Sequence, residues 1–483
     1  MASLEELLST YPSAPAVSSE AIRAAMAAGP RRVFVVLDDD PTGTQSVADL
    51  PVLTRWETAD LAWALARDVP AVYVLTNTRS LAPAEAAGRN REVARAALEA
   101  ASGLGIAVSF VSRGDSTLRG HFPLETDVLR EEYTASTGRT VDGILLVPAF
   151  PDAGRVTIGG VHYFVLDGQA VPVAETEFAR DATFGYRHSD LPGYVEEKTG
   201  GTVAATDVLV LDLDTIRRGG PEAIADLLLG ARDAVPIAVD YVAEEDLRQV
   251  ALGLALAEAR GGTYLFRAGP PFARGVIGQD PRPPLTAAEI FAGGEPATRG
   301  GLIVVGSHVG VTTRQLDHLG ANLPVALTAE IDVASVIDPA RREAHLEGLV
   351  RDITTALSRG NVVVHTSREL VKTEDGDESL DISRRVSAAV VDVVRRTLAN
   401  TPPRFVIAKG GITSSDVAAH GLEIRHAIVR GPMLPGIVSL WEPQDGPARG
   451  IPYIVFAGNV GADSSLTDVT VKLSATDSKE SHS

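Results

Sequence analysis

The sequence predicts an α/β chain built from two open, mostly parallel three-layer domains. Short runs rich in Val, Ile and Leu recur along the chain and alternate with helical patterns such as residues 83–102 and 380–399. Continuous apolar runs are typical of strands buried on both faces, as in parallel sheets covered by helices. Polar and glycine-rich residues directly follow most of these runs, which is where ligands of open α/β sheets bind.

The apolar runs form two series. The first series predicts strands at 33–38, 72–77, 106–112, 143–148, 207–212, 236–240 and 263–267. The second series predicts strands at 302–306, 324–328, 361–366, 404–409 and 452–456. Residues 151–203 carry aromatic and turn residues without this rhythm, so we expect an excursion from the first sheet.

A segment rich in Pro and Gly separates the two series and predicts a domain boundary. The expected organisation is therefore the following: an N-terminal helical arm (1–30), a first domain (31–280), a linker (281–300), a second domain (301–471) and a disordered tail (472–483).

Composition excludes several classes of protein. Lys and Arg total 44 against 63 Asp and Glu, a formal net charge of −19, which argues against a nucleic-acid groove. The absence of cysteine excludes disulfides, thiolate nucleophiles and Cys-ligated zinc. Neither a secretory signal nor an uninterrupted apolar run of about 18 residues is visible. We therefore expect a cytoplasmic protein with no membrane or nucleic-acid partner.

Three consecutive aspartates, Asp38 to Asp40, follow the first predicted strand. Crowded carboxylates repel one another unless a positive charge lies near. They could bind substrate hydroxyls, help to hold Mg²⁺ or supply a base. Alternatively, one of them caps the next helix through Thr42 and Gly43 while the others are solvated.

The end of the third predicted strand reads RGDSTLRGH, residues 113–121, and combines two arginines with hydroxyls and a carboxylate. Arginine binds carboxylates through paired hydrogen bonds, and Asp, Ser and Thr suit sugar hydroxyls. Arg79, after the second strand, could join as a carboxylate clamp. The alternatives are a turn in which Asp115 caps a helix, and a surface position for Arg79.

Glycines and hydroxyls dominate the strand ends of the second series: GSHVGVTTRQ (306–315), KGGITSSD (409–416) and AGNVGAD (457–463). Paired glycines such as Gly410 and Gly411 let the backbone approach an anion closely, although ordinary turns use them too. The sequence has no GxxxxGK[ST] loop, no GxGxxG at the first helix and no GxSxG elbow. The ten histidines show no metal-ligand spacing, so the ligands of any metal stay unknown.

In order along residues 33 to 470, these motifs resemble the four-carbon acid sugar kinase family, which includes threonate, erythronate and 3-oxo-tetronate kinases. The resemblance rests on the segments 38–43, 113–121, 144–161, 306–315, 410–413 and 458–461. Arg113 and His121 stand where the family usually has Lys and Asn, and Arg and Lys differ in geometry.

The resemblance implies a sugar-acid-binding N-terminal domain, an ATP-binding C-terminal domain and an active site in the cleft between them. By position, the residues expected to face the sugar acid are Asp39, Asp40, Arg79, Arg113, Asp115, Ser116 and Thr117. Those expected to face ATP are Ser307, Gly410, Gly411, Ile412, Thr413 and Gly458.

The expected reaction is transfer of the γ-phosphate from Mg²⁺·ATP to a hydroxyl of the acid, with Asp115, Asp39 and Arg119 as the catalytic candidates. A small-molecule acid is the expected partner, and a homodimer is possible. Two alternatives stay open: an NAD-dependent dehydrogenase of a related acid, and a non-catalytic sugar-acid-binding protein.

Overall fold

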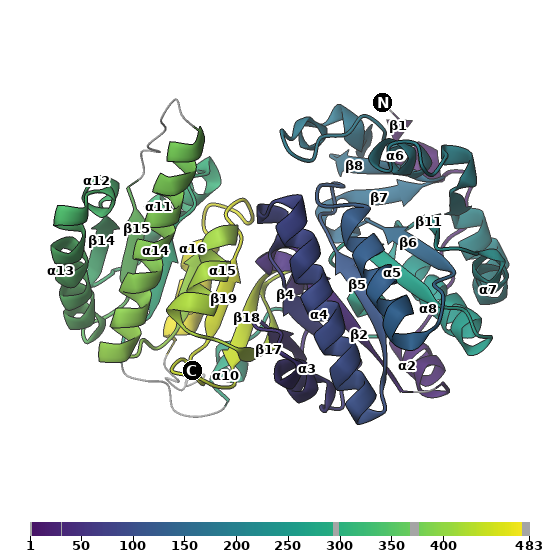
Figure 1. Ribbon diagram of the computed structural model, residues 1–483. Coiled ribbons are helices and arrows are strands. Elements are labelled where there is room, and N and C mark those ends of the chain that lie inside the picture. Colours follow the sequence, from purple (N-terminus) through teal and green to yellow (C-terminus); the bar gives the residue numbers. More distant parts are fainter. Residues whose placement is uncertain (1, 30, 293–298, 368–375, 476–483) are drawn as a thin grey trace, which may run out of the picture. The chain divides into compact units, whose positions relative to one another are not determined.

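The computed structural model describes residues 2–29, 31–292, 299–367 and 376–475. The chain separates into two compact units, Met1–Pro281 and Arg282–Ser483. In each unit, helices flank a central sheet (Figure 1).

Unit 1 contains a parallel sheet. Its strands, in chain order, are β2 (Arg32–Asp38), β3 (Leu50–Leu53), β4 (Ala71–Leu75), β5 (Ala107–Arg113), β6 (Gly143–Val147), β10 (Leu209–Leu211), β11 (Val235–Val239) and β12 (Tyr264–Ala268). Their order in the sheet is β10-β11-β6-β12-β5-β2-β4-β3, and every neighbouring pair is parallel. The carboxyl ends of β2, β4 and β5 therefore lie side by side.

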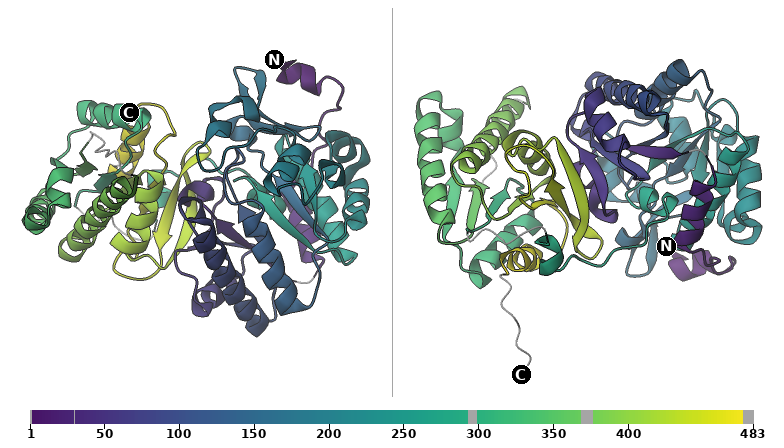
Figure 2. Two further views of the ribbon diagram at one scale, coloured as in Figure 1. Left: turned by 45° about the horizontal axis from the view of Figure 1, so that its top comes forward. Right: turned by 90° about the horizontal axis from the view of Figure 1, so that it is seen from below.

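Helices cover both faces of this sheet (Figure 2). The helices of unit 1 are α1 (Leu4–Leu8), α2 (Ser19–Ala27), α3 (Thr58–Leu65), α4 (Pro83–Leu104), α5 (Leu124–Thr137), α6 (Leu191–Lys198), α7 (Gly220–Gly230), α8 (Glu244–Ala259) and α9 (Phe272–Val276), of which α1 packs on the small antiparallel sheet described below. One core joins alternate residues of β2 to buried side chains of α3, α4, α5 and α6. The N-terminal arm packs on the same unit, because α2 contacts α8 and buries Ile22.

Short 3-10 helices follow two of the strand ends, η1 (Pro41–Ser46) after β2 and η2 (Thr78–Ser80) after β4. The segment expected as an excursion forms a separate antiparallel sheet, ordered β1-β9-β8-β7. Its strands are β1 (Ala2–Ser3), β7 (Arg155–Ile158), β8 (Val161–Leu166) and β9 (Gln169–Pro172).

Unit 2 has a mixed sheet with the order β17-β18-β19-β16-β13-β15-β14. Its strands are β13 (Leu302–Val305), β14 (Leu327–Ile331), β15 (Val362–Thr366), β16 (Val406–Lys409), β17 (His426–Leu434), β18 (Ile437–Pro443) and β19 (Tyr453–Phe456). The strands from β19 to β14 are parallel, whereas β17, β18 and β19 form antiparallel pairs.

The helices of unit 2 are α10 (Ala287–Ile290), α11 (Gly310–Asn322), α12 (Val333–Ile337), α13 (Pro339–Leu357), α14 (Gly376–Asn400), α15 (Gly411–Asp416) and α16 (Ser465–Ser474). Buried residues of α11 and α16 share one core with β13, β16 and β19. On the described part of the chain, no helix is both long and apolar enough to cross a membrane.

The α/β fold with largely parallel sheets is confirmed, but several strands were missed or misplaced. Strands β3, β7, β8, β9, β17 and β18 were not predicted. All of them except β3 form antiparallel pairs, and β8, β9 and β17 mix buried with partly exposed residues, unlike the continuous apolar runs of the parallel strands. Strand β14 spans Leu327–Ile331, three residues later than the predicted 324–328.

The ends of the predicted domains also need correction. Helix α10 lies inside the predicted linker 281–300, and α16 continues to Ser474, so the tail cannot begin at 472. Residues 476–483 lie outside the described residues, as do 293–298 of the linker.

Candidate active site

The carboxyl end of β2 carries three aspartates beside the ends of β4 and β5. Asp38 lies opposite Arg113 of β5 in the sheet register. Asp40 caps η1, where its Oδ1 accepts hydrogen bonds from the backbone N–H and the hydroxyl of Thr42 at 2.9 and 2.5 Å. Asp38 and Asp39 are buried. The capping interpretation therefore holds for Asp40, but the other two aspartates are not solvated.

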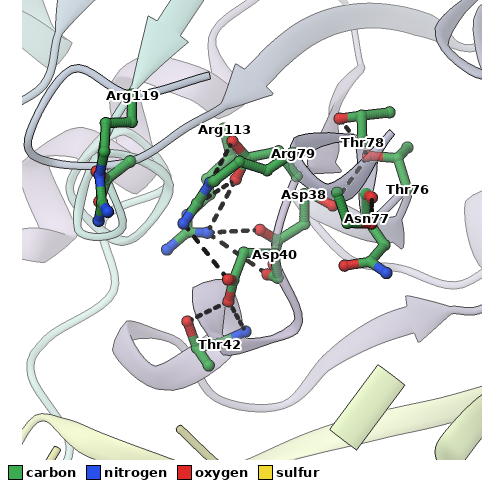
Figure 3. Close-up of polar contacts among 12 residues, drawn as sticks. Asp38, Asp40, Thr42, Thr76, Asn77, Thr78, Arg79, Arg113 and Arg119 are labelled. Atoms are coloured by element: carbon green, nitrogen blue, oxygen red, sulfur yellow. Dashed lines mark hydrogen bonds and ion pairs between the residues drawn. The ribbon is translucent and has the colours of Figure 1, made fainter. Parts of the chain in front are cut away.

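Two arginines neutralise the aspartates (Figure 3). Arg79 Nε and Nη2 donate to the two carboxylate oxygens of Asp39 at 3.1 and 2.6 Å, and Arg79 Nη1 reaches Asp40 Oδ2 at 3.4 Å. Arg113 Nη1 donates to Asp38 Oδ1 at 2.9 Å and to Asp39 Oδ1 at 3.4 Å. The paired contact of Arg79 with Asp39 is the strong, oriented form of this interaction. Four of the predicted acid-facing residues thus share one cluster.

Burial and charge set different pKa values within the cluster. Burial raises the pKa of Asp38 to about 7, although Arg113 opposes this, and burial also raises the pKa of Asp39. Burial acts in the same direction on Asp40, but Arg79 and Arg113 outweigh it and lower the pKa of that carboxyl. Asp40 is therefore ionised at neutral pH, whereas Asp38 titrates near neutrality.

The loop after β5 places Asp115 at the centre of a second set of contacts. Its Oδ2 accepts hydrogen bonds from Thr117 Oγ1 and from Arg119 Nε, the latter at 2.7 Å. In the described part of the chain, no hydrogen bond uses its Oδ1. Burial favours the neutral acid, but Arg79 and Arg119 outweigh it and hold the pKa of Asp115 well below its usual range. Asp115 is therefore a carboxylate with one oxygen available to a ligand.

Side chains from the excursion segment hold this loop from behind through its carbonyl groups. The contacts are His162 Nε2 with Ser116 O at 2.8 Å, Tyr186 OH with Thr117 O at 2.7 Å and Tyr194 OH with Leu118 O at 2.9 Å. Leu118 has φ 67°, a left-handed conformation that costs energy for a residue with a side chain. The excursion therefore fixes the loop shape, and the backbone alone would not adopt it.

Sequence reasoning missed a buried ion pair beneath the same loop. Arg267 of β12 donates to Glu125 of α5 at 2.5 Å and to Ser112 Oγ at 2.8 Å. An added Cβ at Gly114 or Gly120 would collide with the guanidinium of Arg267. The sequence does contain Arg267 near the end of an apolar strand and the glycines Gly114 and Gly120 in RGDSTLRGH. Only the fold shows that the arginine contacts these glycines.

A narrow recess lies beside Asp115. Its lining includes Leu118, Leu191, Tyr194 and Arg267 as well as Asp115. The recess is too small to hold a sugar acid, so it carries no argument about the substrate.

In unit 2, the predicted nucleotide-facing residues gather at the carboxyl ends of β13, β16 and β19. An added Cβ at Gly458 would collide with Ser307 Oγ, and one at Gly306 would collide with Thr413 Oγ1. Gly410 has φ 125°, and its added Cβ would lie 3.1 Å from Thr413 Oγ1 and 3.3 Å from Ser307 Cβ. The three strand ends are therefore in close contact, and the glycines make that contact possible.

The residues on either side of the glycine pair differ in burial. Gly411 begins α15, and the side chain of Ile412 is 60% exposed. Lys409, directly before the glycine pair, was not selected from the sequence. Lys409 is fully buried, and its Nζ donates to Ala457 O at 2.8 Å.

Among the described residues, we looked for side chains that could hold a metal ion without help from a nucleotide. Among those residues, no group of three or more His, Cys, Asp or Glu side chains is arranged to hold a metal ion. Asp38 to Asp40 are engaged with arginines and with the start of η1, as described above.

Two domain families match this chain. Residues 34–276 match the model described as a sugar-binding N-terminal domain, and residues 302–466 match the model described as a nucleotide-binding C-terminal domain. The chain belongs to the four-carbon acid sugar kinase family. The resemblance inferred from the motifs is thereby confirmed, as is the class of carbohydrate kinase.

Relatives with a named sugar-acid substrate are about a quarter identical to this chain. A D-erythronate kinase from Heliobacterium modesticaldum is 25% identical over 424 residues, covering 82% of this chain and 88% of the relative. A 3-oxo-isoapionate kinase from Paraburkholderia graminis is 26% identical over 358 residues, covering 68% of this chain and 72% of the relative.

Solved structures support the fold of the kinase family. A crystal structure from Salmonella typhimurium LT2 has a TM-score of 0.65 at 20% identity and covers 90% of this chain and 98% of its own. One from Haemophilus influenzae has a TM-score of 0.61 at 17% identity and covers 91% and 100%. At these identities the likeness shows the fold alone.

Proposed function

We propose that this chain is an ATP-dependent kinase that phosphorylates a hydroxyl, expected to be the terminal one, of a four-carbon sugar acid such as a threonate, an erythronate or a 3-oxo-tetronate. The observation that carries the proposal is the order of the two matches, sugar-binding at 34–276 and nucleotide-binding at 302–466. Two relatives named as sugar-acid kinases support the same class of substrate.

The acid is bound by the cluster in unit 1. The side chains of Arg79 and Arg119 are 21% and 27% exposed, so each can offer N–H groups to the substrate carboxylate. Arg113 is only 5% exposed, so its role is to neutralise Asp38 and Asp39 from behind. The carboxylates of Asp40 and Asp115 accept hydrogen bonds from the sugar hydroxyls. Ser116 and Thr117 are buried, and Thr117 Oγ1 donates to Asp115 Oδ2, so their predicted contacts with the acid are not part of this proposal.

The nucleotide is bound by the strand ends of unit 2. Gly410, Gly411 and Gly458 bring the backbone close to the phosphates, and Ser307 and Thr413 add hydroxyls. Ile412 offers an exposed apolar surface to the nucleotide. Mg²⁺ neutralises phosphate charge when bound, and phosphate oxygens and water supply most of its ligands, as is usual for this ion.

The chemistry requires positioning more than covalent work by the protein. The substrate hydroxyl oxygen forms a bond to the γ-phosphorus, the bond to the β,γ-bridging oxygen breaks, and ADP leaves. Asp115 Oδ1 accepts the hydroxyl proton, because Oδ2 is held by Thr117 and Arg119. We prefer Asp115 to Asp39, whose carboxylate oxygens are both taken by Arg79.

The direct test is ADP release from Mg²⁺·ATP across a panel of four-carbon acids and their 3-oxo derivatives. We expect turnover with at least one member and none with NAD⁺ in place of ATP. No ADP release above the acid-free rate with any member would overturn the proposal.

The Asp115→Asn variant tests the role of the proton acceptor. Positioned general bases contribute about 10²- to 10⁴-fold to rate, so we expect a fall in kcat of that order. Binding of MgADP, measured by titration calorimetry, should be unchanged. A kcat equal to that of the unmodified chain would remove Asp115 from this role.

A homodimer and a cytoplasmic location stay predictions. Light scattering coupled to gel filtration measures the first, and a mass of one chain at working concentration would contradict it.

A further inference from the structure

The turn that follows β19 is held from beneath by three buried polar side chains. Lys409 Nζ donates to Ala457 O at 2.8 Å, and Thr312 Oγ1 donates to Gly458 O at 2.7 Å. Gln315 Nε2 donates to two further carbonyls, those of Val460 and Ala462, at 3.0 and 2.8 Å. Lys409, Thr312 and Gln315 are each 0% exposed. Three side chains are thus committed to the backbone of one short turn.

These contacts orient the N–H groups of the turn. In a planar trans peptide the C=O and the following N–H point in opposite directions. With the carbonyls of Ala457 and Gly458 directed at buried donors, the N–H groups of Gly458 and Asn459 point to the opposite side. Within the described residues, no hydrogen bond uses these two N–H groups. Asn459 is exposed, so this side of the turn can meet a ligand.

Lys409 is the least expected of the three donors. Its ammonium lies 3.8 Å from the centre of the Phe456 ring, and among the described residues no acidic side chain acts on its pKa. Burial lowers the pKa of Lys409 to about 7, which shows how poorly this place suits a charge. Buried ionic groups are often less stabilising than apolar residues of similar volume. Stability of the core does not explain a lysine here.

We propose that Lys409 is a positioning residue for the nucleotide, which fixes the Ala457–Gly458 peptide so that its N–H side stays turned toward the phosphates. This inference rests on the proposed function, in which Gly458 contacts the nucleotide. Gly458 lies close to Ser307, since an added Cβ at Gly458 would collide with Ser307 Oγ. Without the Lys409 contact the Ala457–Gly458 peptide is free to rotate, and the position of Gly458 relative to Ser307 would change.

The test is the Lys409→Met variant of the full chain, which removes the ammonium and keeps a flexible apolar side chain. We expect the Kd for MgADP and the KM for ATP to rise about tenfold, which corresponds to one hydrogen bond to a charged group. The KM for the acid should be unchanged, and the Tm should be equal or higher. The matched control is Lys472→Met, because Lys472 Nζ donates to Met433 O at 2.8 Å, outside the turn. The control should bind MgADP as the unmodified chain does.

Three results would overturn the inference. They are unchanged MgADP affinity in Lys409→Met, an equal loss in Lys472→Met, and a loss accompanied by a fall in Tm, which indicates a purely structural role. If Lys409→Met does not fold, the MgADP affinity of Thr312→Val tests the inference instead. This substitution removes only the contact to Gly458 O, and unchanged affinity there would reject the idea that buried donors position the turn. Failure of the unmodified chain to bind MgADP would instead refute the proposed function.

Discussion

The strand ends of the two units carry different kinds of residue. In unit 1 the ends of β2, β4 and β5 carry buried aspartates that are paired with Arg79 and Arg113. In unit 2 the ends of β13, β16 and β19 carry glycines and hydroxyls, and the buried charge there, Lys409, contacts a carbonyl. Unit 1 is organised by side-chain charge, whereas unit 2 is organised by backbone shape. Charge substitutions should therefore damage unit 1 most, and an added Cβ should damage unit 2 most.

The largest expected effect is that of Arg113→Met on stability. Removing one partner of a buried ion pair costs about 3–5 kcal/mol, because the remaining charge is left uncompensated. Here Asp38 would lose its arginine, and Asp39 would keep only Arg79. The loss should be greatest above pH 7, where Asp38 is ionised in the unmodified chain and would have to take up a proton to avoid a bare buried charge. Guanidinium chloride unfolding measures the free energy. Arg113→Lys retains a charge and should lose less; equal losses in the two variants would show that charge is not what matters.

An intermediate effect is expected for Gly410→Ala. Gly410 has φ 125°, which is unfavourable for any residue with a Cβ, so the strain should cost about 1–3 kcal/mol and weaken MgADP binding. The matched control is Gly436→Ala, since Gly436 also has a positive φ, 67°, but lies between β17 and β18 with open space around its Cβ position. Its MgADP affinity should stay unchanged. Equal losses of affinity would break the comparison.

The smallest expected effect within any one pH unit is a pH dependence of stability caused by Lys409. The pKa of Lys409 is about 7 in the folded chain against 10.5 for an ordinary exposed lysine, so between these two values the unfolded chain binds more protons. Stability should therefore rise with pH through this window, by at most about 1.4 kcal/mol per pH unit from this group. The difference in unfolding free energy between Lys409→Met and the unmodified chain should shrink from pH 7 to pH 10. A difference in unfolding free energy that stays constant from pH 7 to pH 10 would contradict the lowered pKa of Lys409.

The sequence predicted the parallel core because its strands are continuous apolar runs. It did not predict β17, in which buried and partly buried residues alternate, or β18, whose short buried run is interrupted by Ser439. Most of the candidate site followed from one rule, that polar residues after parallel strands share an edge. Asp39, Arg79 and Arg113 meet for that reason.

The supporting residues could not be predicted in the same way. Arg267 and Glu125 are 142 positions apart, and their meeting depends on β12 lying next to β5. Lys409 reads as an ordinary lysine before a glycine pair, and only its complete burial shows that it is unusual. Residues that act through other residues leave no local signal in a sequence.

The central claim, that unit 1 binds the acid and unit 2 binds the nucleotide, is tested most directly by two titrations on two variants. Calorimetry with MgADP and with the acid found active in the panel would be run on Arg119→Met and Gly410→Ala. We predict that Arg119→Met weakens only the acid and Gly410→Ala weakens only MgADP. Weakening of the same single ligand by both variants would contradict the assignment of one substrate to each unit.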